Sequence, residues 1–481
     1  CGAGGGGGAG GTGYPLNAGA GLENSITGTE VLYGEGGAGR DSASYGTTVS
    51  GGGSYNSFVG VANTGGGGAD GGSFAGRGGS GLVVIAFDNG LTINSGSAKT
   101  DLQGDVTKLS KLDITSSHAA NAASGVISGL TPISYTGTTA GQLTISGDNT
   151  FTGNVNVVSG SLSITHNNAL GSTSGSTTVA SGAVLSISND ITSGENITIA
   201  GTGISSNGAI RNTADDNTLT GLITLAAHSE IQIDSGSSLT FNPSTGNAIT
   251  GTYNLTIESV GTTTISDPIA ISTGNLTKTG AGTLTLGGTN SYTGDTTISA
   301  GTIILTGSVN TATDLSIASG ATLDLQVAQT FATLDLDGTI SNTAGTSTLT
   351  ITGTSDIGGS ITTSGTQDYE GAVTVTGNST LSTTNAQITF DTTVHSETGE
   401  TNNLTITASE VQFDGIIGGS RTLGAISITG SLDLNQAIAN ATSLSVSTTS
   451  NLGADVTTSS TQTYSGAVTL SNNVTLTTTN N

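Results

Sequence analysis

The chain has 481 residues, 78 of them glycine, and its formal net charge of −25 comes from 33 acidic and 8 basic side chains. So few lysines and arginines cannot build a phosphate-binding surface, which excludes a nucleic-acid partner. A single cysteine excludes an internal disulfide framework. Because methionine is absent, we expect the chain to be the middle of a longer protein.

Residues 1–90 are predicted to form a glycine-rich domain, because they hold 32 of the glycines. Apolar residues interrupt the glycines and end in the strand-like run Leu82 to Phe87, which argues against a flexible linker. The stretch Asn63 to Phe87 resembles the closing half of the glycine-rich domain of phage tail proteins and large bacterial secreted proteins. The resemblance implies a domain that begins upstream. The alternative, that Cys1 is the acylated first residue of a lipoprotein, stays open.

Residues 91–140 are predicted to be a transition or cap segment. This segment holds Lys99, Lys108 and Lys111, and its stretch from Thr107 to Ile114 has the only faint helical pattern of the chain. We expect it to lead into the domain that follows.

Residues 141–481 read as short strands separated by Gly, Asn and Asp turns, with apolar residues alternating with Ser or Thr. Turn glycines recur after 22 residues, from Gly160 to Gly182, and after 19, from Gly301 to Gly320. One coil of a parallel β-helix is about that long. The sequence therefore predicts an all-β, right-handed parallel β-helix of roughly 17 coils. An array of β-sandwiches is the alternative, disfavoured because no aromatic core anchors recur.

Two longer repeats overlie this period. Residues 364–378 recur as 459–473, an offset of 95, which corresponds to four or five coils. Residues 276–307 resemble the passenger-associated repeat of bacterial autotransporters, and an earlier copy has the same frame at an offset of 141. The matching positions are Gly282, Leu284, Leu286, Gly288, Asn290, Tyr292, Gly294 and Gly301, and in the earlier copy Leu143, Ile145, Gly147, Asn149, Phe151, Gly153 and Gly160. The resemblance implies a secreted β-helical passenger.

Catalytic residues are not predicted. Asp215 and Asp216, which follow Arg211, are similar to the paired carboxylates of a glycoside hydrolase. However, the chain has too few basic residues to complete such a site, and a solvated turn is the simpler interpretation.

Metal and cofactor sites are not predicted from the histidines, because His118, His166, His228 and His395 show no ligand spacing. No cofactor is expected. Calcium is the one ion that stays open, because Asp324, Asp335, Asp337 and Asp433 lie in an acidic chain.

The sequence favours a structural and adhesive function. We expect a rod that presents Ser, Thr and Asn to glycans or neighbouring cell surfaces, in an extracellular protein attached to the bacterial outer membrane through segments outside this chain. A phage tail fibre or extracellular filament subunit, with self-association, is the alternative. A polysaccharide-degrading β-helix enzyme is the third interpretation.

Overall fold

The computed structural model describes residues 22–24, 31–33 and 90–480, with gaps at 108 and 130–131. The chain divides into two units, Cys1–Asp88 and Asn89–Asn481. In the first unit only β1 (Leu22–Asn24) and β2 (Val31–Tyr33) are described, as an antiparallel pair. The predicted glycine-rich domain otherwise lies outside the described residues.

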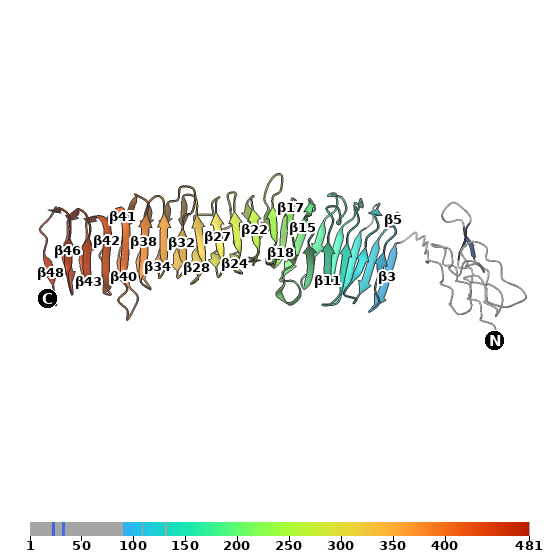
Figure 1. The fold of residues 1–481 in the computed structure, drawn as a ribbon, viewed down its shortest axis with the longest axis horizontal. Coiled ribbons are helices and arrows are strands. Elements are labelled where there is room, and N and C mark those ends of the chain that lie inside the picture. Colours follow the sequence, from blue (N-terminus) through green and yellow to red (C-terminus); the bar gives the residue numbers. More distant parts are fainter. Residues whose placement is uncertain (1–21, 25–30, 34–89, 108, 130–131, 481) are drawn as a thin grey trace, which may run out of the picture. The chain divides into compact units, whose positions relative to one another are not determined.

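The second unit is an all-β parallel solenoid of about 18 turns (Figure 1). Its strands form three parallel ladders, which we call faces 1, 2 and 3 in the order in which the chain visits them. The long strands β11, β18, β41, β42 and β43 bend round a corner and therefore contribute to two faces. The prediction of a parallel β-helix is confirmed.

Each face is a stack of short strands, and most strands are three to five residues long. Face 1 contains β3 (Leu91–Gly96), β6 (Leu112–Ser116), β9 (Ile133–Gly137), β11 (Val155–Ile164), β12 (Thr177–Val179), β15 (Ile197–Gly201), β18 (Ile223–Ile233), β20 (Ile249–Gly251), β23 (Ile269–Ala270), β30 (Gln329–Phe331), β33 (Leu349–Ile351), β36 (Gln367–Tyr369), β39 (Gln387–Phe390), β41 (Leu404–Phe413), β42 (Leu423–Leu434), β44 (Ser450–Leu452) and β47 (Val468–Leu470). Face 2 contains β4 (Asp101–Leu102), β7 (Asn121–Ala123), β10 (Gln142–Ile145), β13 (Ala183–Ile187), β16 (Ile210–Asn212), β21 (Leu255–Ser259), β24 (Leu276–Thr279), β26 (Thr296–Ile298), β28 (Leu315–Ile317), β31 (Leu334–Leu336), β34 (Ser355–Ile357), β37 (Val373–Val375), β40 (Val394–Ser396), β43 (Ile438–Val446), β45 (Val456–Thr458) and β48 (Leu476–Thr478), together with parts of β11 and β18. Face 3 contains β5 (Val106–Thr107), β8 (Ile127–Ser128), β14 (Thr192–Ser193), β17 (Asp216–Leu219), β19 (Ser238–Phe241), β22 (Thr262–Ile265), β25 (Thr283–Leu286), β27 (Thr302–Leu305), β29 (Thr322–Leu325), β32 (Thr339–Ser341), β35 (Ser360–Thr363), β38 (Ser379–Thr383) and β46 (Gln462–Tyr464), together with parts of β41, β42 and β43.

The interior is built from columns of apolar side chains. Successive coils pair in register, so that one column runs Leu143, Leu162, Leu185, Ile210, Ile231 and Ile257. All six side chains are buried. Neighbouring members lie about 4.8 Å apart, the spacing of strands in a sheet. No single coil can bury its own apolar residues, so the stack of coils supplies the core.

The solenoid begins within the segment that was predicted to be a transition or cap. Strands β3, β6 and β9 pair in parallel with one another and with β11, so residues 91–140 already form coils. The helical pattern between Thr107 and Ile114 was misleading, because Leu112 and Ile114 point into the core from strand β6. Among the described residues the only helix is the 3₁₀ turn η1 (Ile204–Ser206).

The long sequence repeats rotate from one face to another. Leu143 and Leu284 are equivalent in the two copies of the passenger-type motif, yet the column of Leu143 on face 2 leads to Lys278, while Leu284 lies on face 3. Similarly, Tyr369 lies on face 1 and its equivalent Tyr464 on face 3. The same motif can therefore occupy different faces, and each repeat advances by a number of whole faces rather than whole coils.

Candidate functional site

The fold pairs Arg211 with another aspartate than Asp215 and Asp216, the two that were weighed with it as a catalytic group. Arg211 forms a bidentate ion pair with Asp234, with nitrogen–oxygen distances of 2.9 to 3.2 Å. The Asp215 carboxylate accepts the backbone N–H of Asn189, and the Asp216 carboxylate accepts the Ser238 hydroxyl at 2.7 Å. Each aspartate thus connects two adjacent coils, and Arg211 pairs with neither.

The histidines lie far apart and have local partners. His118 and His228 accept backbone N–H groups from Ala120 and Asn254 through Nδ1, and His395 contacts the guanidinium of Arg421. Among the described residues, no group of three or more His, Cys, Asp or Glu side chains is placed to hold a metal ion.

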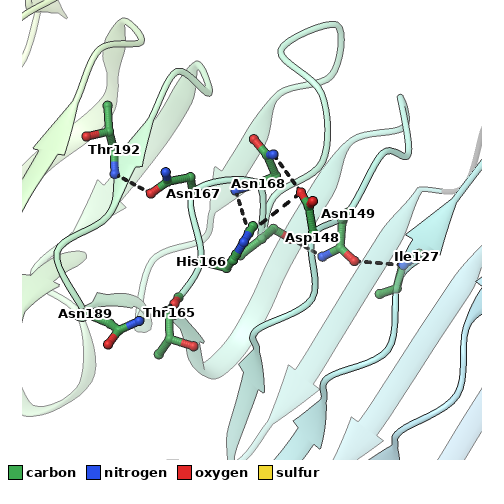
Figure 2. A network of polar contacts seen from close by, with 10 residues as sticks. Ile127, Asp148, Asn149, Thr165, His166, Asn167, Asn168, Asn189 and Thr192 are labelled. Carbon is green, nitrogen blue, oxygen red and sulfur yellow. Dashed lines mark hydrogen bonds and ion pairs between the residues drawn. The ribbon is translucent and has the colours of Figure 1, made fainter.

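The fourth histidine, His166, belongs to an asparagine-rich corner (Figure 2). Its Nδ1 accepts the backbone N–H of Asn168, whose side-chain amide donates to Asp148 on the preceding coil at 2.8 Å. Asn167 accepts the backbone N–H of Thr192 on the following coil. This corner therefore joins three coils through side chains, which is a structural use of polar residues.

Of the aspartates considered as calcium ligands, Asp324 accepts hydrogen bonds within the protein and Asp335 lies near other carboxylates. Asp324 accepts the backbone N–H of Thr343 at 2.8 Å and the amide of Gln326. Burial, followed by the carboxylates of Asp337 and Asp356, raises the pKa of Asp335 above its usual range. Calcium binding stays a prediction.

The motif asparagines hold the coils together from inside. Asn149 and Asn290 are 2% and 1% exposed. The Oδ1 atom of each accepts a backbone N–H from the preceding coil, Ile127 at 2.8 Å and Ile269 at 2.9 Å. The Nδ2 atom donates to a carbonyl of the following coil, that of Ala169 or Ser308. One buried side chain thereby supplies backbone partners on two coils, which explains why the motif has an amide at this position.

Lys278 is a buried charged residue that was not predicted from the sequence. It is fully buried, and it lies between Ile257 and Ile298 in an interior column. Its ammonium donates to the carbonyls of Thr279 (2.5 Å), Gly280 (2.7 Å), Ser259 (3.2 Å) and Ala300 (3.3 Å). Burial lowers its pKa to about 8, although the Glu258 carboxylate opposes this. The only sequence signal was a lysine at an inward-facing strand position.

The outer surface of face 3 carries a continuous ladder of hydroxyl side chains. Eight successive coils pair in register at one outward position, occupied by Ser238, Thr262, Thr283, Thr302, Thr322, Thr339, Ser360 and Thr380. We call these eight residues the hydroxyl ladder. In the first three of these coils a second threonine follows two residues later, at Thr240, Thr264 and Thr285. A hydroxyl group can both donate and accept a hydrogen bond, although that of Ser238 already donates to Asp216.

An open hollow of about 380 Å³ adjoins the start of the hydroxyl ladder. Its lining includes the carboxylate-bearing Asp216, the hydroxyl residues Ser238, Thr262 and Thr283, and the exposed Val260. Glycines at the corner between faces 2 and 3 leave it open, because no side chain projects from them. A polar surface of this shape suits weak contacts with a polyhydroxylated ligand better than enclosure of a substrate.

A second open hollow, of about 290 Å³, lies on face 1 near the C-terminal end of the described residues. Its lining includes Glu410, Asp433, Asn451 and Thr469. The Asn451 amide donates to Asp433 at 2.8 Å. The Asp433 carboxylate therefore already has a hydrogen-bond partner in the protein.

Two segments match a family model described as passenger-associated-transport-repeat, residues 136–164 and 276–305. They are the two segments whose motif positions were aligned above. Comparison with curated proteins and with solved structures gave no match. No helix in the described part of the chain is long and apolar enough to cross a membrane.

Proposed function

We propose that this chain is an adhesive part of an autotransporter passenger, in which the hydroxyl ladder and its hollow contact glycans. The passenger-associated repeats support the passenger assignment, and the family implies secretion to the cell surface. The observation that carries the adhesive function is the in-register ladder over eight coils, from Ser238 to Thr380.

The ladder fits glycans because its chemistry repeats along the rod. Rungs lie about 4.8 Å apart, so one extended polysaccharide can contact several coils at once. Each contact is weak, because it exchanges hydrogen bonds with water for hydrogen bonds with the ligand. Several weak contacts on one rigid support add through effective concentration, which is how a surface without a deep pocket can still hold a polymer.

Net charge limits the class of glycan. With −25 formal charges on the chain, an anionic polysaccharide would be repelled at low salt. We therefore propose neutral glycans and neighbouring cell surfaces as the partners, without a cofactor.

Binding of the purified chain to an array of neutral and acidic oligosaccharides tests this proposal. Four rungs, Thr262, Thr283, Thr302 and Thr322, are replaced by valine, which keeps the branched shape and removes the hydroxyl. Binding to neutral glycans should fall about thirtyfold or more, because each of the four lost contacts is worth about 0.5 to 1.5 kcal/mol.

A second threonine column supplies the matched control. Thr178, Thr198, Thr224 and Thr250 pair in register on face 1, and neither hollow is lined by them. Their replacement by valine should leave binding unchanged. Equal binding by the wild-type chain and both variants would refute the assignment to the hydroxyl ladder.

We further propose that the chain is not an enzyme. Arg211 is paired with Asp234 instead of Asp215 and Asp216, which supports this proposal. Polysaccharide cleavage by the wild-type chain that disappears in Asp215→Asn and Asp216→Asn variants would overturn it.

A further inference from the structure

The first half of the solenoid contains coils that are longer than most of those that follow. Leu185 pairs with Ile210, Ile197 with Ile223, and Ile231 with Ile257, so these coils have 25 or 26 residues. Farther along, Leu276 pairs with Thr296 and Ser355 with Val373, which corresponds to coils of 20 and 18 residues. We call residues 185–258 the long-coil segment. Its additional residues form loops, which are visible around β17 and β18 in Figure 1.

The long-coil segment buries two carboxyl groups. Glu195 is 2% exposed, and its Oε2 atom has no hydrogen-bond partner. Its Oε1 atom is 3.5 Å from the hydroxyl of Thr177 on the preceding coil. Gly221 of the following coil lies against the backbone carbonyl of Glu195 and has no side chain that could contact this carboxyl. A carboxylate in this position would be desolvated without compensation.

Glu230 is the second buried carboxyl, at 8% exposed. On the following coil Thr256 pairs with Glu230, and Glu258 lies two residues farther along the same strand, so its carboxyl is a second acidic group beside Glu230. The nearby Arg211 guanidinium is held by Asp234. Because two neighbouring carboxylates repel each other, the second acidic group opposes ionisation of the buried Glu230.

Titration supports the same conclusion. Burial raises the pKa of Glu195 to about 7. Burial and the Glu258 carboxyl both raise the pKa of Glu230. In the unfolded chain both groups titrate near 4.5, so the folded state holds more protons than the unfolded state between about pH 4.5 and 7. The stability of these coils is therefore fully present below about pH 4.5 and is lost as the pH rises through 7.

We propose that the long-coil segment is a pH-sensitive joint in the rod, closed when Glu195 and Glu230 carry protons and prone to local opening when they ionise. The coils on either side remain paired through their continuous ladders, so opening stays local. In a one-dimensional stack each coil contacts only its neighbours, which allows one segment to open without unfolding the rest.

Hydrogen–deuterium exchange of the whole chain, resolved by peptide and corrected for intrinsic rates, tests the joint at pH 5.5 and 7.5. Peptides from the long-coil segment should lose about tenfold in protection at the higher pH, whereas peptides from residues 276–373 should not. The Glu195→Gln, Glu230→Gln double variant should lose this response, because its side chains stay neutral.

The matched control uses the long coil between β38 and β41, which exposes Glu397 and Glu400. Replacement of both by glutamine should leave the response of the long-coil segment intact. A pH response spread evenly over all coils would overturn the proposal, as would a response that survives in the Glu195, Glu230 double variant. If that variant fails to fold, the wild-type profile alone decides between a local and an even response.

Discussion

The buried lysine makes a sharp prediction about alkaline pH. The folded state holds Lys278 in an interior column with a pKa of about 8, whereas the lysine of an unfolded chain titrates near 10.5. Between these values the unfolded chain binds more protons than the folded one. The free energy of unfolding should therefore rise with pH in this interval. The buried carboxyl groups of Glu195 and Glu230 have the opposite effect, since they make it fall as the pH rises.

The size of the effect follows from the difference of about 2.5 pKa units. One unit corresponds to about 1.4 kcal/mol, and about 1.5 units of the interval lie below pH 9.5, so stability should rise by about 2 kcal/mol between pH 7 and 9.5. Urea denaturation followed by circular dichroism at several pH values measures it. The Lys278→Met variant should not show the rise, and the difference between the two proteins removes the contribution of every other group.

Two further variants complete the experiment. Lys278→Arg remains charged throughout this range and should also fail to gain stability. Lys111→Met removes a half-exposed lysine paired with Asp113 at 2.6 Å, and it should behave as the wild type does. A rise of equal size in the wild type and in Lys278→Met would refute the argument that the buried ammonium is responsible.

Three more substitutions probe the interior and the corners by the same denaturation assay. Asn290→Leu should cost about 2 to 4 kcal/mol, because the buried backbone N–H of Ile269 loses its acceptor. Gly359→Ala should cost more than about 2 kcal/mol, because its new methyl group would lie 1.9 Å from the carbonyl oxygen of Gly338. Tyr369→Phe should cost about 1 kcal/mol, since the buried hydroxyl donates to Gln367 at 3.0 Å.

Each of these substitutions has a counterpart at an exposed or open position. Asn275→Leu, Gly104→Ala and Tyr253→Phe make the same chemical changes, where Asn275 and Tyr253 are not buried and where nothing lies within 4 Å of the new methyl group at Gly104. These controls should change stability by less than about 0.5 kcal/mol. Equal losses in a variant and its control would show that burial is not the cause.

The periodic features of the fold were predictable from the sequence, because strand alternation and turn spacing are local properties. Apolar residues two apart, as in Leu284 and Leu286, define an inward face whatever the neighbouring coils are. The beginning of the solenoid was not predictable in this way. Between Leu112 and Ile114 the alternation spans only three residues, and Lys108 and Lys111 beside it suggest a solvated helix more than a strand.

The sequence predicts that the hydroxyl ladder is made of exposed threonines and serines, but it does not predict which of them align from coil to coil. Threonine at Thr262 and Thr302 indicates an exposed strand face, yet their alignment depends on how many residues each turn consumes. Coil lengths vary between neighbouring coils, so register is set by packing across coils. The role of Lys278 depends on carbonyls from three coils, a convergence that no local pattern encodes.

The rotation of the repeats has a consequence for how such a rod can lengthen. Tyr369 and Tyr464 occupy equivalent motif positions on different faces, separated by 95 residues. A duplicated block therefore need not contain complete turns, because a block of any whole number of strands ends where the next face begins. Gene segments of many lengths can be copied in tandem and still leave every strand paired. Duplication then changes the direction in which a given surface motif faces, which gives one rod several orientations of the same motif.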